Sequence, residues 1–287
     1  MSRIAANDIE FEYAEYGQAG GEPIIIINGL AGQLVDWPEM LLHELAARGL
    51  HVIVFDNRDA GLSTELAHLG EPDLAGVVND ALEPPYTLVD MGDDVVALLD
   101  ALDIEKAHVL GASMGGSIAQ AVALDHPDRV CTLTVAMTTP FRPFRDEPFL
   151  STVTQASPVE RDRDTVIAGD VAGFRWLGGP GGFVSEADAR VRAERRYDRS
   201  YRPRAALRHI AAILGSPDRR AELGRLDVPA LVLHGEDDPL IDVRNGRALA
   251  AAITGARLVV APLRGHQEDW LVEYVDDIFE NTQRAKA

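Results

Sequence analysis

A serine lies between two glycines in a sequence pattern that is typical of a catalytic nucleophile. An apolar stretch begins at Ala107 and runs into Gly-Ala-Ser-Met-Gly at 111–115, and a helix-forming run follows at 117–125. Strand, G-x-S-x-G and helix in this order predict a tight turn that lifts the Ser113 hydroxyl clear of a sheet. Glycines suit positions 111 and 115 because side chains there would collide with the neighbouring strand and helix. We expect Ser113 to be a nucleophile; the alternative is a glycine-rich turn with an incidental serine.

A serine hydroxyl becomes a nucleophile when a neighbouring base takes its proton. Of the eight histidines, only His266 follows the last expected strand, at 257–260. Its loop returns to the carboxyl edge of the sheet, where open α/β sheets bind ligands. We therefore predict that His266 is the base. Six others fall in helices, at helix ends, at strand starts or in a polar loop: His43, His51, His68, His108, His126 and His209.

The acid that orients this histidine is expected between Ser113 and His266 in the chain. The loop after the apolar stretch 230–233 contains three carboxylates in a row, Glu236, Asp237 and Asp238. Asp238 is the preferred candidate, because the turn has left the strand by then and a proline follows it. Asp237 is the second candidate.

Acyl transfer also needs backbone N–H groups that stabilise the carbonyl oxygen as it becomes charged, and losing one typically costs about 3 kcal/mol in the transition state. One donor is expected to be the N–H of Met114, directly after the serine. The loop after the run Ile24–Ile27 supplies the other, and Leu30 is the candidate there. Gly29 and Gly32 let that backbone turn inward.

The elements that must position these groups alternate along the chain. Apolar runs typical of buried parallel strands occupy 24–27, 51–55, 107–110, 130–136, 230–233 and 257–260. Expected helices occupy 38–49, 88–102, 117–125, 243–253 and 269–281. Residues 9–16 alternate apolar and polar as in a half-exposed antiparallel strand. The pattern predicts an α/β fold with a mostly parallel sheet covered on both faces.

Residues 141–225 differ from this pattern, because they contain helical patches and no clear strand. We predict a core domain formed by 1–140 and 226–287, interrupted by a helical cap at 141–225. Aromatic side chains of the cap, with Phe141 and Trp176 as candidates, are expected to bind an apolar part of the substrate. The cap also carries a cluster of arginines, predicted to be a solvated helix face paired with cap carboxylates Glu186, Asp188, Glu194 and Asp198.

Composition excludes several classes of function. The net charge of −19 disfavours nucleic acid and anionic membrane surfaces as partners. The single cysteine, Cys131, rules out an internal disulfide and a cysteine-based metal site. The longest aliphatic run has four residues, too few to span a membrane, and the amino-terminal residues lack an apolar signal core. We expect a cytoplasmic protein that uses no metal or cofactor, with its oligomeric state open.

Taken together, four segments resemble those of the α/β-hydrolase superfamily. Within it, they are most similar to bacterial carboxylesterases and aclacinomycin-methylesterase-like hydrolases. The segments lie at 27–30, 56–63, 111–116 and 234–238 with 265–266. The resemblance implies a Ser113–His266–Asp238 triad and an oxyanion hole at Leu30 and Met114. The sequence departs from the pattern in two places: an asparagine occupies position 28, where histidine is frequent, and Asp-Ala at 59–60 replaces Gly-x.

These observations predict a serine hydrolase that cleaves a small-molecule carboxylic ester, with an apolar portion, through an acyl-enzyme. Three alternatives remain at this point. The same triad could serve an acyltransferase or a hydrolase of carbon–carbon bonds, and the fold could act as a non-catalytic ligand-binding protein.

Overall fold

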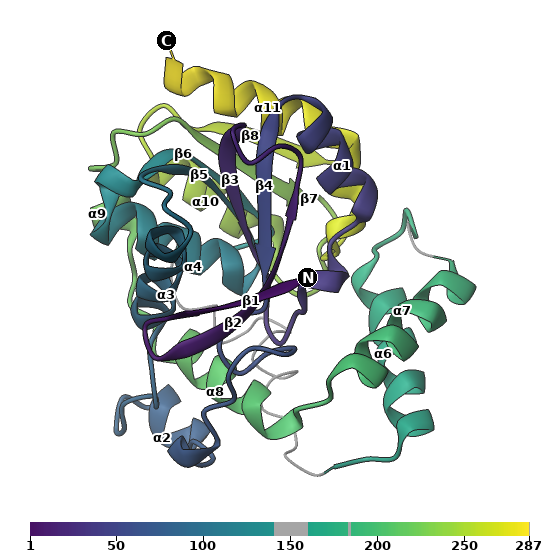
Figure 1. The fold of residues 1–287 in the computed structure, drawn as a ribbon. Helices are drawn as coiled ribbons and strands as arrows, with labels where there is room; N and C mark the ends of the chain where they lie inside the picture. Colours follow the sequence, from purple (N-terminus) through teal and green to yellow (C-terminus); the bar gives the residue numbers. More distant parts are fainter. Residues whose placement is uncertain (141–159, 183–184, 287) are drawn as a thin grey trace.

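The computed structural model describes residues 1–140, 160–182 and 185–286, so Phe141 lies outside the described residues. In the described part, eight strands form one sheet in the order β1-β2-β4-β3-β5-β6-β7-β8 (Figure 1). The pairs β1–β2 and β2–β4 are antiparallel, and all others are parallel. The strands are β1 (Ser2–Ala6), β2 (Ile9–Tyr16), β3 (Glu22–Ile27), β4 (Leu50–Phe55), β5 (Ala107–Ala112), β6 (Val130–Ala136), β7 (Ala230–Gly235) and β8 (Arg257–Ala261).

Helices cover both faces of this sheet. Core side chains of α3 (Leu88–Ala101), α4 (Met114–Asp125), α8 (Pro203–Leu214) and α10 (Val243–Ala252) cluster on one face. Those of α1 (Glu39–Ala47) and α11 (Val275–Gln283) cluster on the other. The further α-helices are α2 (Leu74–Val78), α6 (Arg163–Leu177), α7 (Glu186–Arg199) and α9 (Arg220–Leu223). This architecture confirms the expected α/β-hydrolase fold.

Strand β3 shows how the sequence specifies a sheet buried on both faces. Successive side chains of a strand point to opposite sides. Ile25 and Ile27 accordingly join one apolar cluster, while Ile24 and Ile26 join the other. All four are at most 1 % exposed. An unbroken β-branched run is therefore what a central parallel strand needs.

Some local expectations differ from the structure. Strand β1 was not expected, because its residues are mostly exposed and pair only with β2 at the sheet edge. No helix was expected between the strand at 51–55 and the helix at 88–102, but α2 lies there. The last helix was expected from 269, whereas Glu268–Tyr274 form a 3-10 helix (η4) and α11 follows.

The described part of the predicted cap packs in two different ways. Helices α6 and α7 lie together and share a small apolar cluster that includes Phe174 and Ala193. Helix α8 instead places Leu207 and Ile210 in the main core cluster. The division into a core at 1–140 and 226–287 and a cap at 141–225 stays a prediction. In the residues that the structure describes, no helix is both long and apolar enough to cross a membrane.

Candidate active site

Ser113 occupies the turn between β5 and α4 with φ of +55°, in the left-handed region that few residues other than glycine adopt. The glycines on either side have no room for a side chain. A Cβ at Gly111 would lie 2.1 Å from the carbonyl oxygen of Gly115, and one at Gly115 would lie 2.1 Å from that of Ile27. Both obstacles are backbone atoms, so the turn depends on glycine at both positions.

The three residues expected to act together do meet at the carboxyl edge of the sheet. His266 Nε2 lies 2.9 Å from Ser113 Oγ, and His266 Nδ1 lies 2.7 Å from Asp238 Oδ2. Asp238 follows β7 and His266 follows β8, so each group stands just beyond a strand end. The other carboxylate oxygen of Asp238 accepts hydrogen bonds from the backbone N–H groups of Leu240 (2.9 Å) and Ile241 (2.8 Å). Of the candidate acids, Asp238 is the one in contact with the imidazole.

Charges around His266 favour its protonated form. Burial lowers the pKa of His266, but the charge and hydrogen bond of Asp238, together with the charge of Glu268, outweigh burial and raise the pKa above its ordinary value. A second histidine, His234, lies 3.5 Å from Asp238 and donates from Nε2 to the Ile241 carbonyl (2.8 Å). Burial is the largest effect there and lowers the pKa of His234, so His234 stays neutral. The negative charge of Asp238 is therefore left to stabilise His266.

The acidic residues after His266 have two roles in the structure. Glu268 and Asp269 form the first turn of η4, where carboxylates are favoured. They also form ion pairs with Arg192 on α7, at 3.3 and 2.9 Å. These carboxylates therefore belong to the start of a helix, and the charge of Glu268 also raises the pKa of His266.

The loop after β3 lies against Ser113. A Cβ on Gly29 would be 3.3 Å from that of Ser113, and the Gly32 N–H closes a turn by donating to the Gly29 carbonyl (3.1 Å). Leu30 lies inside this turn, and its role as a donor to a substrate oxygen stays a prediction. Met114 is the first residue of α4, so its N–H has no acceptor within the helix.

The two departures from the family pattern have structural partners. The Asn28 side chain donates to the Phe55 carbonyl (2.9 Å), which ties β3 to the end of β4. Asp59 has φ of +65°, which explains why glycine would suit its position. Its carboxylate is held by a bidentate pair with Arg208 (2.8 and 2.7 Å) and by the Tyr86 hydroxyl (2.8 Å).

The expectation that the cap arginines form a solvated face was largely wrong. Arg190 does pair with Glu194 on its own helix (3.1 Å). Most of the others turn toward carboxylates of the N-terminal half, because a charge buried at this interface needs a partner. These pairs are Arg192–Asp36, Arg196–Asp36, Arg199–Asp56, Arg202–Glu65 and Arg208–Asp59. The interface between α7, α8 and the rest of the protein is therefore strongly ionic.

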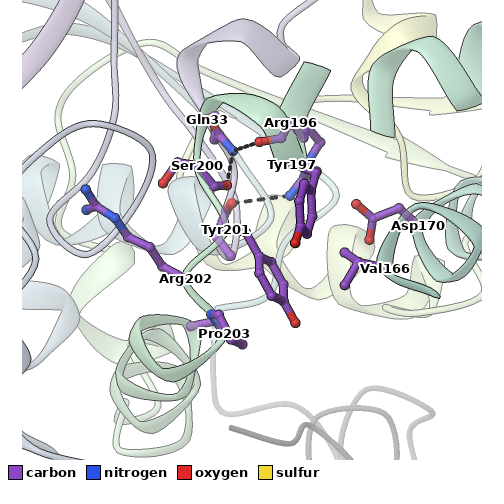
Figure 2. A pocket seen from close by; sticks show the side chains of 11 residues that line it. Gln33, Val166, Asp170, Arg196, Tyr197, Ser200, Tyr201, Arg202 and Pro203 are labelled. Carbon is purple, nitrogen blue, oxygen red and sulfur yellow. Dashed lines mark hydrogen bonds between the residues drawn. The ribbon is translucent and has the colours of Figure 1, made fainter. Parts of the chain in front are cut away.

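One pocket opens beside the loop after β3, at Ala31 (Figure 2). Trp176 is not among its lining residues and is 43 % exposed near the end of α6, so its role in substrate binding stays a prediction. The lining combines two stacked tyrosine rings with charged, polar and apolar side chains: Gln33, Val166, Asp170, Arg196, Tyr197, Ser200, Tyr201, Arg202, Pro203 and Ala206. Sequence reasoning missed this set because it comes from α6, α7, α8 and the loop together.

Comparisons with known proteins agree with this architecture. The family described as "alpha/beta hydrolase fold" matches residues 22–267. Rhodomycin D methylesterase DnrP of Streptomyces peucetius is 28 % identical, with 92 % of each chain covered. A putative carbamate hydrolase, RutD, of a Caulobacter species is 30 % identical, over 85 % of this chain and 84 % of that one.

Solved structures show the same fold over the whole chain. A hydrolase from Pseudomonas aeruginosa superimposes with a TM-score of 0.74 at 26 % identity, covering 100 % of this chain and 98 % of the other. The enol-lactonase from Burkholderia xenovorans gives 0.76 at 23 % identity, covering 99 % of both, which is a likeness of fold. On this evidence the chain belongs to the α/β-hydrolase fold family of hydrolases.

Proposed function

We propose that the protein is a serine hydrolase that cleaves carboxylic esters through an acyl-enzyme. The observation that carries the proposal is the continuous hydrogen-bonded chain from Ser113 Oγ through His266 to Asp238. Nucleophile, base and orienting acid in this order are what acyl transfer by a serine requires. The similarity to a methylesterase and to a putative carbamate hydrolase supports hydrolysis at a carbonyl carbon.

In the first half of the reaction, His266 Nε2 takes the proton of Ser113 Oγ while the oxygen attacks the ester carbonyl. The oxygen of the tetrahedral intermediate is stabilised by the N–H groups of Leu30 and Met114. His266 then gives its proton to the leaving alcohol, and the acyl group stays on Ser113. In the second half, His266 takes a proton from water as the water attacks the acyl-enzyme. His266 then returns a proton to Ser113 Oγ, the bond between Ser113 and the acyl group breaks, and the acid is released.

Asp238 acts through His266. Its bond to Nδ1 keeps Nε2 facing Ser113, and its charge stabilises the imidazolium formed in each half of the reaction. The bonds from Leu240 and Ile241 hold the carboxylate in one orientation. The raised pKa of His266 moves the pH range in which the neutral base predominates upward.

The pocket beside Ala31 is proposed to receive a part of the ester away from the reacting carbonyl. Ala31 directly follows Leu30, so a substrate held at the oxyanion hole lies next to this pocket. Its phenol rings, Tyr197 and Tyr201, stack with centroids 5.0 Å apart and offer apolar faces with polar tips. The carboxylate of Asp170 lines the same pocket (Figure 2).

Hydrolysis of p-nitrophenyl esters of increasing chain length, by the wild type and by Ser113→Ala, tests the proposal. We expect activity in the wild type and a loss of about 10⁴-fold or more in the variant. Ser117→Ala is the matched control, because Ser117 lies one turn further along α4 and bonds Thr138 (3.1 Å). A fluorophosphonate should label the wild type and the control but not Ser113→Ala.

Activity that survives Ser113→Ala would contradict the proposal. A wild type that neither hydrolyses these esters nor reacts with the fluorophosphonate would favour the ligand-binding alternative. Carbamate analogues and an added alcohol belong in the same assay. Faster turnover of the carbamates, or formation of a new ester, would replace ester hydrolysis with carbamate hydrolysis or acyl transfer.

A further inference from the structure

A histidine that the proposed reaction does not use reaches the loop that carries the oxyanion donor. His209 lies on α8, is 0 % exposed and has hydrogen-bond partners at both ring nitrogens. Nδ1 lies 3.2 Å from the backbone nitrogen of Ala31, and Nε2 lies 2.7 Å from the carbonyl oxygen of Arg58. Ala31 is the neighbour of Leu30.

The two partners fix the tautomer of His209. The Ala31 N–H can only donate, so Nδ1 must present its lone pair, and the Arg58 carbonyl can only accept, so Nε2 must carry the hydrogen. A protonated ring would place an N–H against the N–H of Ala31. Burial, the largest effect, lowers the pKa of His209 and keeps the neutral form in place.

The turn that receives this bond has a conformation that its residue type disfavours. It is closed by the Gly32 N–H on the Gly29 carbonyl, and its third residue, Ala31, has φ of +52°. A left-handed third residue is the arrangement of a type II turn, which selects glycine there. Reversing the peptide group between Leu30 and Ala31 would relieve the alanine and would turn its N–H away from His209.

The carbonyl group of Ala31 also has a hydrogen-bond partner. Arg196 on α7 donates from Nη2 to the Ala31 carbonyl (3.3 Å), and Arg196 is itself paired with Asp36 (3.3 Å). Next to His209 on α8, Arg208 is anchored on Asp59 by its bidentate pair. The helices that hold the turn are therefore fixed by ion pairs to the N-terminal half.

We propose that His209 is a positioning residue of the oxyanion hole, because its Nδ1 holds the Ala31 N–H and so maintains the turn that directs the Leu30 N–H toward the substrate oxygen. The two N–H groups belong to adjacent peptide planes, so the orientation of one constrains the other through the backbone angles of a single residue. The inference rests on the proposed function of Ser113 and extends it to a residue of α8.

Two conservative variants test the hydrogen bonds of the two ring nitrogens of His209 separately. The amide oxygen of His209→Asn lies where Nδ1 was and can still accept from Ala31, but the side chain no longer reaches Arg58. The amide of His209→Gln lies where Nε2 was and can still donate to Arg58, but it leaves the Ala31 N–H without its acceptor. Each variant loses one hydrogen bond, so they are matched in polarity and in the number of bonds lost.

The measurement is kcat and KM for one p-nitrophenyl ester, with active sites counted by fluorophosphonate labelling so that unfolded protein does not contribute. We expect His209→Gln to lower kcat by about 10- to 100-fold, part of the loss seen when an oxyanion donor is removed. KM should change by less than about threefold, since ground-state binding is not the interaction removed. His209→Asn should keep kcat within about threefold of the wild type.

Binding of a trifluoromethyl ketone, which forms a tetrahedral adduct with the serine, gives a second readout. Its affinity should fall for His209→Gln in parallel with kcat and stay near the wild-type value for His209→Asn. Equal losses in both variants, or no loss in His209→Gln, would overturn the proposal. Failure of the proposed function has a different signature, because either Ser113→Ala would keep its activity or the wild type would neither hydrolyse the ester nor react with the fluorophosphonate.

Discussion

The carboxyl edge of the sheet and the interface of helices α7 and α8 with the rest of the protein differ in what specifies them. Local sequence motifs specify the edge, and contacts between distant residues specify the interface. At the edge, Ser113, Asp238 and His266 each follow a strand within a few residues, and a short motif specifies each one. At the interface, pairs such as Arg208–Asp59 join residues that are 149 positions apart. The first region contains the groups proposed to react, and the second region holds the loops around them.

Helices α6 and α8 contact both sides of the proposed active site. From α8, His209 reaches the loop of Leu30, and from the end of α6 the Leu177 carbonyl accepts a hydrogen bond from the His266 N–H (2.6 Å). The Gln267 side chain donates to the Phe174 carbonyl (2.7 Å). The comparison teaches that local motifs place the chemistry, whereas long-range polar contacts fix its geometry.

The largest effect is expected at the edge. Asp238→Asn should lower kcat by about 10⁴-fold, because the amide offers His266 Nδ1–H a weaker partner and can reverse the tautomer of the imidazole. Asp237→Asn is the control, since Asp237 is exposed and contributes its backbone N–H to the Arg264 carbonyl. Steady-state kinetics of both variants decides between the two carboxylates. A larger loss of kcat for Asp237→Asn would mean that Asp238 is not the orienting acid.

At the interface, the buried pair of Arg208 should matter much more than an exposed pair. Arg208→Met leaves Asp59 buried without its cation, so the free energy of unfolding should fall by about 3–5 kcal/mol. Arg163→Met removes an exposed pair with Asp198 that water and salt screen, so it should change the free energy of unfolding much less. Urea unfolding measures both values. Equal values would mean that the ionic interface contributes no more to stability than surface charges do.

A glycine at the sheet edge and a glycine on α6 should respond in opposite directions. Gly115→Ala places a Cβ against the Ile27 carbonyl and should destabilise the protein by about 3 kcal/mol. Gly173 lies in the interior of α6, and nothing lies within 4 Å of a Cβ built there. Gly173→Ala should therefore raise the free energy of unfolding by about 0.5–1 kcal/mol. Thermal unfolding of both variants checks the signs, and a stabilised Gly115→Ala would disprove the account of the turn.

The smallest effect is expected in the pH dependence. The reaction needs neutral His266, so kcat/KM should rise as the pH passes the pKa of His266. The charge of Glu268 raises that pKa, so Glu268→Gln should lower it and move the acid limb of the kcat/KM profile to lower pH. Glu273→Gln is the control, because Glu273 pairs with Arg264 (2.8 Å). A shift to higher pH in Glu268→Gln would contradict this assignment.

Much of the fold could be predicted because the sheet is buried on both faces. Runs such as 24–27 and 130–136 have the composition that only a central strand requires, so their type and order follow from the sequence. Strand β1 could not be predicted, since a half-exposed edge strand carries no such apolar signal. The arginines of α7 were misassigned, because a charged helix face looks the same in sequence whether it meets water or buried carboxylates.

By itself, the sequence determined the chemistry of the proposed site: a serine held between glycines, a histidine after the last strand, and acids in the intervening loop. Their types and order are local properties of strand ends. Only the tertiary structure decided that Asp238 rather than Asp237 contacts His266, and that His209 contacts the loop of Leu30. Those contacts depend on which backbone and side-chain groups lie next to each other in the folded chain. Contacts between residues that are distant in sequence leave no local sequence pattern.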